Sequence, residues 1–453
     1  MIGFGNGNQK KIPIGYEDFK LLIDGGFYYV DKTMLIYDLL SLGGQNNLIT
    51  RPRRFGKTLN FSMLKYFFDI TQKDNAYLFD GTNIMRYADE VSPYRNAFPV
   101  ISLSLKCAKQ GSYSRALFHI CMDIREQFIK FSYVLDSDKL TEIEKKDYRR
   151  ILECETGDEQ LFGTALKKLS NALSKYYGRN AIIFIDEYDM PLEDAYLCGY
   201  YNDMVSFIRT LFESALKTNP SLQFSVITGS LHVLNESVFS AINNIEISSI
   251  RRGGYSQFFG FTNEEIDALI SYYKLDSKKS ELSNWYGGYR FGNVSVYNPW
   301  SVLHQIKQWS LDYDTPPQSL WKDMSYNDLI NACLPSMIQN LKDLLSDKEV
   351  YSTIYNSISF DGLKNDSASL YTFMYYIGYI TTSSVNIQDG KSAYLLKIPN
   401  LEVQGWYNDI INKTEINGNI NETTAKDKPI DIGNPHHESN NNDDNGKYSC
   451  ILE

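Results

Sequence analysis

The sequence has 453 residues, of which 43% are hydrophobic and 22% are charged, and its formal net charge is −10 at pH 7. This length predicts two or three domains, and the composition excludes a wholly disordered or fibrous chain. The negative charge argues against a protein whose whole surface binds nucleic acid.

The six cysteines are scattered without a C-x-x-C pair, as is typical of reduced thiols inside the cell. No apolar run approaches ~18 residues, and the first residues lack the features of a signal peptide. We therefore expect a soluble protein of the cytoplasm or nucleus with no membrane partner.

The first predicted elements surround a short apolar strand. Apolar residues recur at helical spacing over residues 34–40, and Gly43 and Gly44 end that helix. Residues 47–50 suit a buried strand, and a loop and a helix that begins near Lys57 follow it. The predicted order is therefore strand, loop, helix.

Four more strands are predicted further along the chain, with amphipathic helices between most of them. The strands cover residues 99–105, 181–185, 222–228 and 245–250, and the helices include residues 114–131, 159–177 and 203–217. Strands that alternate with helices form a mostly parallel sheet with helices on both faces. The predicted fold class is therefore α/β.

The character of the sequence changes after Arg252. Thr262 stands where a helix N-cap is expected, and Glu265 follows three residues later, as in a capping box. We predict a first domain over residues 1–255 and a second, mainly helical domain over residues 256–405. The sequence from roughly Asn412 to Lys447 is rich in Asn, Asp, Glu and Gly, and such a segment cannot bury enough apolar area to offset the cost of ordering, so a disordered tail is predicted over residues 406–453.

The residues after the first strand have the pattern of a phosphate-binding loop, Arg51-Pro52-Arg53-Arg54-Phe55-Gly56-Lys57-Thr58. A P-loop needs a glycine so that backbone N–H groups close on the phosphates, a lysine that reaches the β- and γ-phosphates, and a hydroxyl that holds Mg²⁺. Gly56, Lys57 and Thr58 meet these needs, although Arg51 stands where the first glycine is expected. Taken alone, the stretch is equally well a basic loop before an amphipathic helix.

A second motif is the apolar strand of residues 181–185, which ends in Asp186 and Glu187. In an open α/β sheet, chemistry gathers at the carboxyl ends of the strands, where the P-loop would also lie. We expect Asp186 to hold Mg²⁺ through water and Glu187 to polarise the attacking water. Two acids alone often only solvate a strand end, but together with the P-loop they favour nucleotide chemistry.

Thr228 ends another predicted strand, just before Gly229. If that strand lies between the other two, Thr228 is expected to hydrogen-bond the γ-phosphate or the attacking water; the alternative is that it only begins a turn. Residues 273–276 lack the first residue of a guanine-reading sequence, which favours adenine. The five histidines show no metal-ligand spacing.

These motifs together predict an α/β P-loop NTPase that uses ATP and Mg²⁺. The predicted catalytic residues are Glu187 and Thr228, and Arg251, Arg252 and Arg290 are candidate phosphate contacts. Thr58 and Asp186 are predicted to hold Mg²⁺. The predicted nucleotide-binding residues are Arg54, Phe55, Gly56, Lys57, Thr58 and Asp186.

The sequence resembles the AAA-ATPase-like family, whose P-loop domain is often fused to a C-terminal PD-(D/E)XK nuclease-like domain. The resemblance runs from Ile12 to Val403. It implies an AAA/RecA-like sheet, ATP hydrolysis coupled to an unidentified process, and a P-loop that tolerates Arg51. The blocks that carry it are residues 29–33, 51–58, 184–189, 227–229, 259–262, 285–292, 297–301 and 396–400.

The chain departs from the family pattern at two places. The family usually carries an arginine a few residues beyond Gly229, where this chain has His232. The chain also leaves the pattern soon after Val403, and its tail has no strand with the spaced acids of such a nuclease. Nuclease activity is therefore not carried over.

Two alternative functions stay open. His232 and the missing effector domain motivate a non-catalytic, nucleotide-gated interaction module. The basic doublets Arg149-Arg150 and Arg251-Arg252 motivate a nucleic-acid-associated ATPase whose nuclease domain has been lost. Nothing in the sequence indicates the oligomeric state.

Overall fold

The computed structural model describes residues 9–154, 156–233, 244–320, 338–346, 348–388 and 391–412, together with residues 238, 239, 242, 329 and 330. The chain divides into two compact units, Met1–Asn408 and Asp409–Glu453, and the first holds every labelled helix and strand given below. Residues 401–412 are helical, so this helix extends beyond residue 406, the predicted start of the tail. The predicted disordered tail from residue 413 onward lies outside the described residues.

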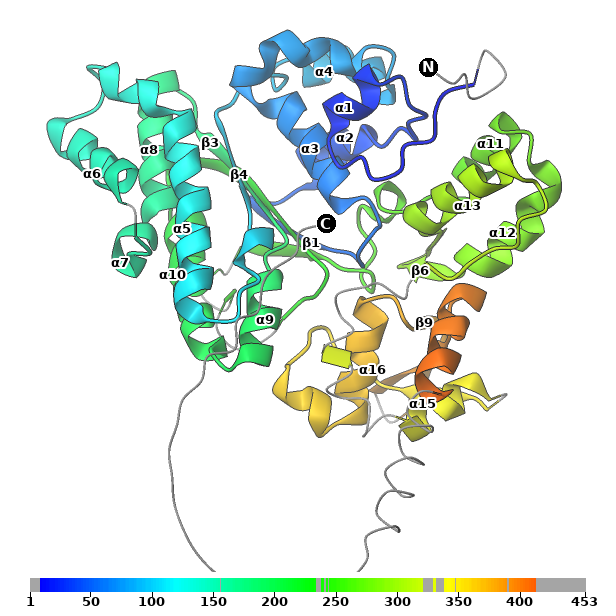
Figure 1. Ribbon diagram of the computed structural model, residues 1–453. Helices are drawn as coiled ribbons and strands as arrows, with labels where there is room; N and C mark the ends of the chain where they lie inside the picture. The colour runs from blue at the N-terminus through cyan, green and yellow to red at the C-terminus, as the bar shows by residue number, and fades with distance from the viewer. Residues whose placement is uncertain are drawn as a thin grey trace, which may run out of the picture. The chain divides into compact units, whose positions relative to one another are not determined.

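A parallel sheet forms the centre of the first unit (Figure 1). Its strand order is β2-β3-β4-β1-β5, and every pairing is parallel. The predicted α/β class is therefore confirmed, and all five predicted strands are present. Their bounds are β1 Asn46–Thr50, β2 Val100–Ser104, β3 Ala181–Asp186, β4 Leu222–Gly229 and β5 Ile245–Ser248.

The strand order decides which loops meet at one edge of the sheet. Strand β4 lies between β1 and β3, with Thr50 opposite Gly229 and Ile185 opposite Ile227. Because the strands are parallel, their carboxyl ends all lie at the same edge. The P-loop after β1 and the acidic pair at the end of β3 are thus separated by one strand.

Helices cover both faces of this sheet, as the sequence predicts (Figure 1). On one face, helix α3 (Lys57–Phe68) places the rings of Phe61 and Phe68 against Phe184 and Phe224, with ring centroids 5.1 to 6.5 Å apart. On the other face lie α5 (Tyr113–Lys130), α8 (Ala165–Tyr177) and α10 (Tyr201–Leu216). These buried aromatic and aliphatic side chains form the core that supports the site.

One predicted helix, over residues 159–177, is in fact two. Helix α7 covers Glu159–Phe162 and α8 begins at Ala165. The break lies at Gly163, whose carbonyl accepts a hydrogen bond from Ser214 of α10 at 2.8 Å. A Cβ at Gly163 would lie 3.0 Å from Thr210, so α10 packs closely here and the chain turns between the two helices.

The C-terminal region combines helices with two small sheets. Thr262 and Glu265 form the predicted capping box at the start of α11 (Asn263–Tyr272). Helices α11, α12 (Lys279–Tyr286) and α13 (Pro299–Leu311) share a buried apolar core. The sheets are antiparallel, β6 (Tyr289–Phe291) with β7 (Val294–Val296), and β8-β10-β9 over Val350–Ser352, Lys391–Lys397 and Thr381–Gln388.

Shorter elements complete the described part of the chain. Among the described residues, no helix combines the length and the apolar character that a membrane crossing requires. The remaining α-helices are α1 Phe19–Asp24, α2 Met34–Leu42, α4 Ala88–Val91, α6 Glu142–Glu153, α9 Met190–Cys198, α15 Ile338–Leu345 and α16 Ser367–Tyr376. The 3₁₀ helices are η1 Ile70–Phe79, η2 Asn83–Tyr87, η3 Lys106–Ala108, η4 Ser132–Asp136, η5 Ser256–Phe258, η6 Asp276–Lys278 and η9 Asp361–Lys364.

Candidate functional site

A cavity of about 450 Å³ opens beside the P-loop, at the carboxyl edge of the sheet. Apolar side chains that include Tyr28, Phe258 and Trp300 line one part of it. The structure therefore brings the predicted P-loop residues and Glu187 to a single cavity. The predicted residues that line it are Arg54, Phe55, Gly56, Lys57, Thr58 and Glu187.

The P-loop passes directly from β1 into α3. Gly56 adopts a left-handed conformation with φ 84° and is the N-cap of the helix, a position at which glycine has no steric cost. Lys57 and Thr58 are the first two residues of α3, so the positive end of the helix dipole and its unpaired N–H groups lie at the loop. This arrangement suits an anion.

The Lys57 ammonium is buried within the loop. Its Nζ donates hydrogen bonds to the carbonyls of Arg51 at 3.0 Å and Pro52 at 3.1 Å, and to Ser230 Oγ at 3.2 Å. Burial lowers the pKa of Lys57, while the carboxylates of Glu187, Asp189 and Asp186 act in the opposite direction. A cation held only by neutral oxygens retains the capacity to bind an anion.

Asp186, at the end of β3, lies beside the first turn of α3. Its carboxylate accepts hydrogen bonds from the hydroxyls of Thr228 and Thr58. Burial raises the pKa of Asp186, and the bond from Thr228 counteracts that increase. A hydroxyl and a carboxylate side by side are oxygen ligands of the kind that Mg²⁺ takes together with phosphate oxygens and water, so the residues fit that ion.

Glu187 has a strained backbone and an unpaired carboxylate oxygen. Its φ of 54° lies in the left-handed region, which is uncommon for a residue other than glycine. Among the described residues, none hydrogen-bonds its buried Oε2 atom. Strain and an unpaired acceptor beside a cavity are features of functional sites, since folding alone gives no reason to keep them.

Asp189 stabilises the junction after β4, a role that sequence spacing does not indicate. It accepts hydrogen bonds from the backbone N–H groups of Ser230 and Leu231, both at 2.8 Å. A Cβ at Gly229 would lie 2.7 Å from Asp189 Oδ1, so only glycine allows this approach. Asp189 thereby fixes Ser230, which accepts a hydrogen bond from Lys57.

The family model described as "Predicted AAA-ATPase" matches residues 13–239, which contain the P-loop, Asp186, Glu187 and Thr228. The chain belongs to the AAA-ATPase-like family. Membership in this family carries nucleotide binding and an ATPase-like function in general terms.

A curated relative extends the similarity beyond the region that the AAA-ATPase-like family model covers. It is described as "Uncharacterized protein in vnfD 5'region" of Azotobacter chroococcum mcd 1. The two sequences are 22% identical over 416 residues, which make up 89% of this chain and 70% of the relative. That description names no activity or substrate.

Arg51 replaces the usual first glycine of the loop and has a structural role in this AAA-ATPase-like chain. Its buried guanidinium donates to the carbonyls of Thr50 and Ser248, both at 2.8 Å, and to that of Gly254 at 2.5 Å. It also lies over the ring of Phe259, 5.2 Å from the centroid. Burial lowers the pKa of Arg51 to about 9. Arg51 thus ties β1 to the segment after β5, a long-range contact that no local pattern predicts.

Phe55 anchors the P-loop of the family to the C-terminal region. The buried ring packs against Tyr289 and Phe291 of β6, with centroids 5.1 and 5.0 Å apart. Its carbonyl accepts a hydrogen bond from the N–H of Gly260 at 3.1 Å. The loop is therefore held from both sides, by the sheet and by the C-terminal region.

The candidate phosphate contacts outside the P-loop do not reach this cavity. Arg251 contacts Tyr394 and Asn356, and Arg290 donates to the carbonyls of Gly292 and Ser383. Arg252 lines a different hollow beside β5. His232 shares a hydrogen bond with the carbonyl of Asn356 at 2.9 Å, and burial lowers its pKa. Among the residues that line the P-loop cavity, none of these four is present.

Proposed function

We propose that this chain binds ATP at the P-loop cavity and hydrolyses it in the presence of Mg²⁺. One observation supports the proposal: the strand order brings Lys57, Thr58, Asp186 and Glu187 to the same edge of the sheet, where Lys57, Thr58 and Glu187 line one cavity. Each of these side chains has a chemical role in phosphoryl transfer. Membership in the AAA-ATPase-like family supports the same function in general terms.

The phosphates would lie over Gly56 and the first turn of α3. There, Lys57 would exchange its hydrogen bonds to the carbonyls of Arg51 and Pro52 for phosphate oxygens. Thr58 and Asp186 would hold Mg²⁺, which when bound neutralises part of the phosphate charge. The apolar part of the cavity would take the adenine base.

The unpaired Oε2 of Glu187 would accept a hydrogen bond from the attacking water and orient it toward the γ-phosphorus. Thr228 would act on this step through Asp186, because its hydroxyl donates to that carboxylate. Its predicted contact with the γ-phosphate or the water remains a proposal. In this proposal Lys57 and Thr58 bind the nucleotide and its metal ion, and Glu187 activates the attacking water.

Calorimetry with ATP and Mg²⁺, combined with a phosphate-release assay, tests the proposal. We expect Lys57→Ala to abolish detectable ATP binding, and Glu187→Gln to bind ATP normally while its turnover falls by roughly 10³-fold. Lys146→Ala, at an exposed site on α6, is the control that retains both activities. Chelation of Mg²⁺ by EDTA should stop turnover, and excess GTP should compete poorly for the base site.

The outcomes separate the competing functions. A wild-type chain that binds no ATP contradicts the proposal outright. Binding without phosphate release favours the non-catalytic, nucleotide-gated module. Turnover that DNA or RNA stimulates would favour the nucleic-acid-associated ATPase. A turnover rate that neither polymer changes would not favour it.

A further inference from the structure

A second hollow, of about 400 Å³, lies between the two small sheets of the C-terminal region. Strands β6 and β9, one from each sheet, lie side by side (Figure 1). Pockets that bind small molecules are typically about 300–1,000 Å³, so this hollow has the size of a ligand site. Of the described residues that line it, none also lines the P-loop cavity.

Each of the two sheets contributes a cation with a hydroxyl beside it. Arg290 of β6 is paired across the strands with Ser295 of β7, and Lys397 of β10 is paired with Thr381 of β9. Residues directly opposite in an antiparallel pair have their side chains on the same face of the sheet. All four residues line the hollow. The two sheets therefore present the same combination of groups to one space.

No carboxylate neutralises these two cations within the described part of the chain. The Nε and Nη1 atoms of Arg290 donate to two backbone carbonyls, at 3.1 and 3.4 Å, which carry no net charge. Among the described residues that line the hollow there is no Asp or Glu. Glu264 follows the lining residue Asn263, but its carboxylate bonds to its own N–H and to Thr262. The hollow therefore suits an anion.

The hydroxyl of Thr381 is a further sign of a missing ligand. The residue is 9% exposed, and among the described residues none hydrogen-bonds its Oγ1 atom. A buried hydroxyl without a partner is costly, and most such groups in folded proteins are paired. An oxygen of a ligand in the hollow would accept the hydrogen bond that Thr381 can donate.

Close contacts hold the segments that carry the two cations against each other. Gly288 has a φ of 82°, and a Cβ there would clash with the carbonyl oxygen of Pro399, so only glycine fits. Asn400 Nδ2 donates to the carbonyl of Gly287 at 2.7 Å. Because Arg290 and Lys397 each lie two residues from this crossing, their backbones are fixed relative to each other before any ligand arrives.

The same segments are sequence blocks to which the P-loop cavity assigns no chemistry. Gly288 and Arg290 belong to residues 285–292, and Lys397 and Pro399 belong to residues 396–400. Neither range contains a residue that lines the P-loop cavity. The hollow between the small sheets is where these two blocks meet.

We infer that this hollow is a second anion site, which binds a phosphate group either as the free anion or as part of a small phosphate ester. A guanidinium offers a planar fork of donors that matches phosphate oxygens, and a lysine adds a point charge. The hydroxyls of Ser295 and Thr381 can donate to the remaining oxygens. Two positive charges also balance a phosphate dianion. The inference is independent of the proposed ATPase function, because it uses no residue of the P-loop cavity.

Phosphorus NMR titrations of the full chain test this site. The parent is Lys57→Ala, so that the phosphate-binding lysine of the P-loop does not contribute, and the ligands are inorganic phosphate and glycerol 3-phosphate. We expect both ligands to bind the parent. Adding Lys397→Gln should weaken binding by roughly 10-fold or more, the value of a charge-assisted hydrogen bond, and adding Thr381→Val should weaken it by about 3-fold.

Lys146→Gln, at an exposed site on α6, removes the same charge outside the hollow and is the matched control that should keep the parent's affinity. Lys397 is itself exposed, so Lys397→Gln should unfold at the parent's temperature. Tighter binding of the ester than of phosphate supports a small-molecule ligand, and equal affinities support the free anion. A parent that binds neither ligand overturns the inference, as does unchanged affinity in Lys397→Gln.

Discussion

The two ends of helix α3 carry buried polar groups that differ in how completely they are paired. At its N-terminal end lie Lys57 and the acids of the candidate site, and immediately after its C-terminal end lies Asp69. Both oxygens of the Asp69 carboxylate accept hydrogen bonds, whereas the candidate site contains a strained backbone and an unpaired oxygen at Glu187. Complete pairing favours stability, and incomplete pairing leaves groups available for a ligand.

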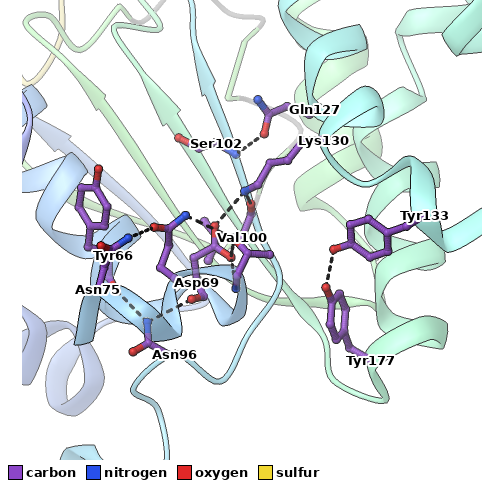
Figure 2. A network of polar contacts seen from close by, with 12 residues as sticks. Tyr66, Asp69, Asn75, Asn96, Val100, Ser102, Gln127, Lys130, Tyr133 and Tyr177 are labelled. Carbon is purple, nitrogen blue, oxygen red and sulfur yellow. Dashed lines mark hydrogen bonds and ion pairs between the residues drawn. The ribbon is translucent and has the colours of Figure 1, made fainter. Parts of the chain in front are cut away.

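Figure 2 shows how the Asp69 network is built. The fully buried carboxylate accepts a hydrogen bond from Lys130 Nζ at 2.8 Å, and its other oxygen accepts from the N–H and hydroxyl of Thr71. Lys130 also donates to the carbonyl of Val100, and Asn96 Nδ2 donates to the carbonyl of Asp69. The network thus fastens the end of α3 to α5 and to the start of β2.

The largest effect on stability is expected from a substitution of Asp69, whose buried carboxylate is hydrogen-bonded at the C-terminal end of α3. We expect Asp69→Ala to lower the free energy of unfolding by roughly 3 kcal/mol, since it leaves Lys130 and Thr71 without their partner. ATP affinity of the molecules that remain folded should be unchanged. Urea denaturation measures the loss, and Asp74→Ala, at an exposed position nearby, is its control. If Asp69→Ala and Asp74→Ala prove equally stable, the hydrogen bonds of Asp69 do not stabilise the C-terminal end of α3.

A smaller effect, and one that depends on pH, is expected at Glu193 beside the site. The ordinary pKa of a glutamate is 4.5, and burial raises that of Glu193 to about 8. Between these values the folded chain holds a proton that the unfolded chain has released, so this group lowers the free energy of unfolding as the pH rises from 4.5 to 8. Arg53, Lys109, Asp189 and Asp194 also act on its pKa.

Glu193→Gln removes this titration. We expect the variant to gain on the order of 2 kcal/mol of stability relative to the wild type between pH 5 and pH 8.5, less than the full shift implies because water and side chains rearrange. Denaturant titrations at both pH values measure the gain. The exposed Glu153→Gln variant should show none of it, and an identical pH dependence in both variants would contradict the prediction.

The smallest effect concerns the backbone strain at Glu187, the residue of the candidate site with an unpaired carboxylate oxygen. Glycine adopts the φ of 54° seen at Glu187 without a steric cost, whereas alanine does not. Glu187→Gly should therefore be more stable than Glu187→Ala by about 1 kcal/mol, although both variants lack the water-orienting carboxylate. Thermal unfolding of the pair measures the strain directly. If alanine proves the more stable of the two, the left-handed conformation is not a source of strain.

Local sequence patterns predicted much of the fold, because they reflect interactions between residues that are close together in the chain. Apolar runs became β1 to β5, and the capping box of Thr262 and Glu265 formed as expected, since a cap involves only neighbouring residues. The break at Gly163 was not predicted, because it depends on packing against α10. The small sheets β6-β7 and β8-β10-β9 of the C-terminal region were missed for the same reason: their strands are short and pair only through tertiary contacts.

The sequence by itself determined the chemical groups of the candidate site, because Gly56, Lys57 and Thr58 lie within one loop and Asp186 and Glu187 end one strand. Only the tertiary structure decided that these two motifs meet, since the position of β4 between β1 and β3 depends on chain topology. It also placed Arg53 against α9, 140 residues further along the chain at Glu193. Contacts at such separations arise from packing, which no local pattern encodes.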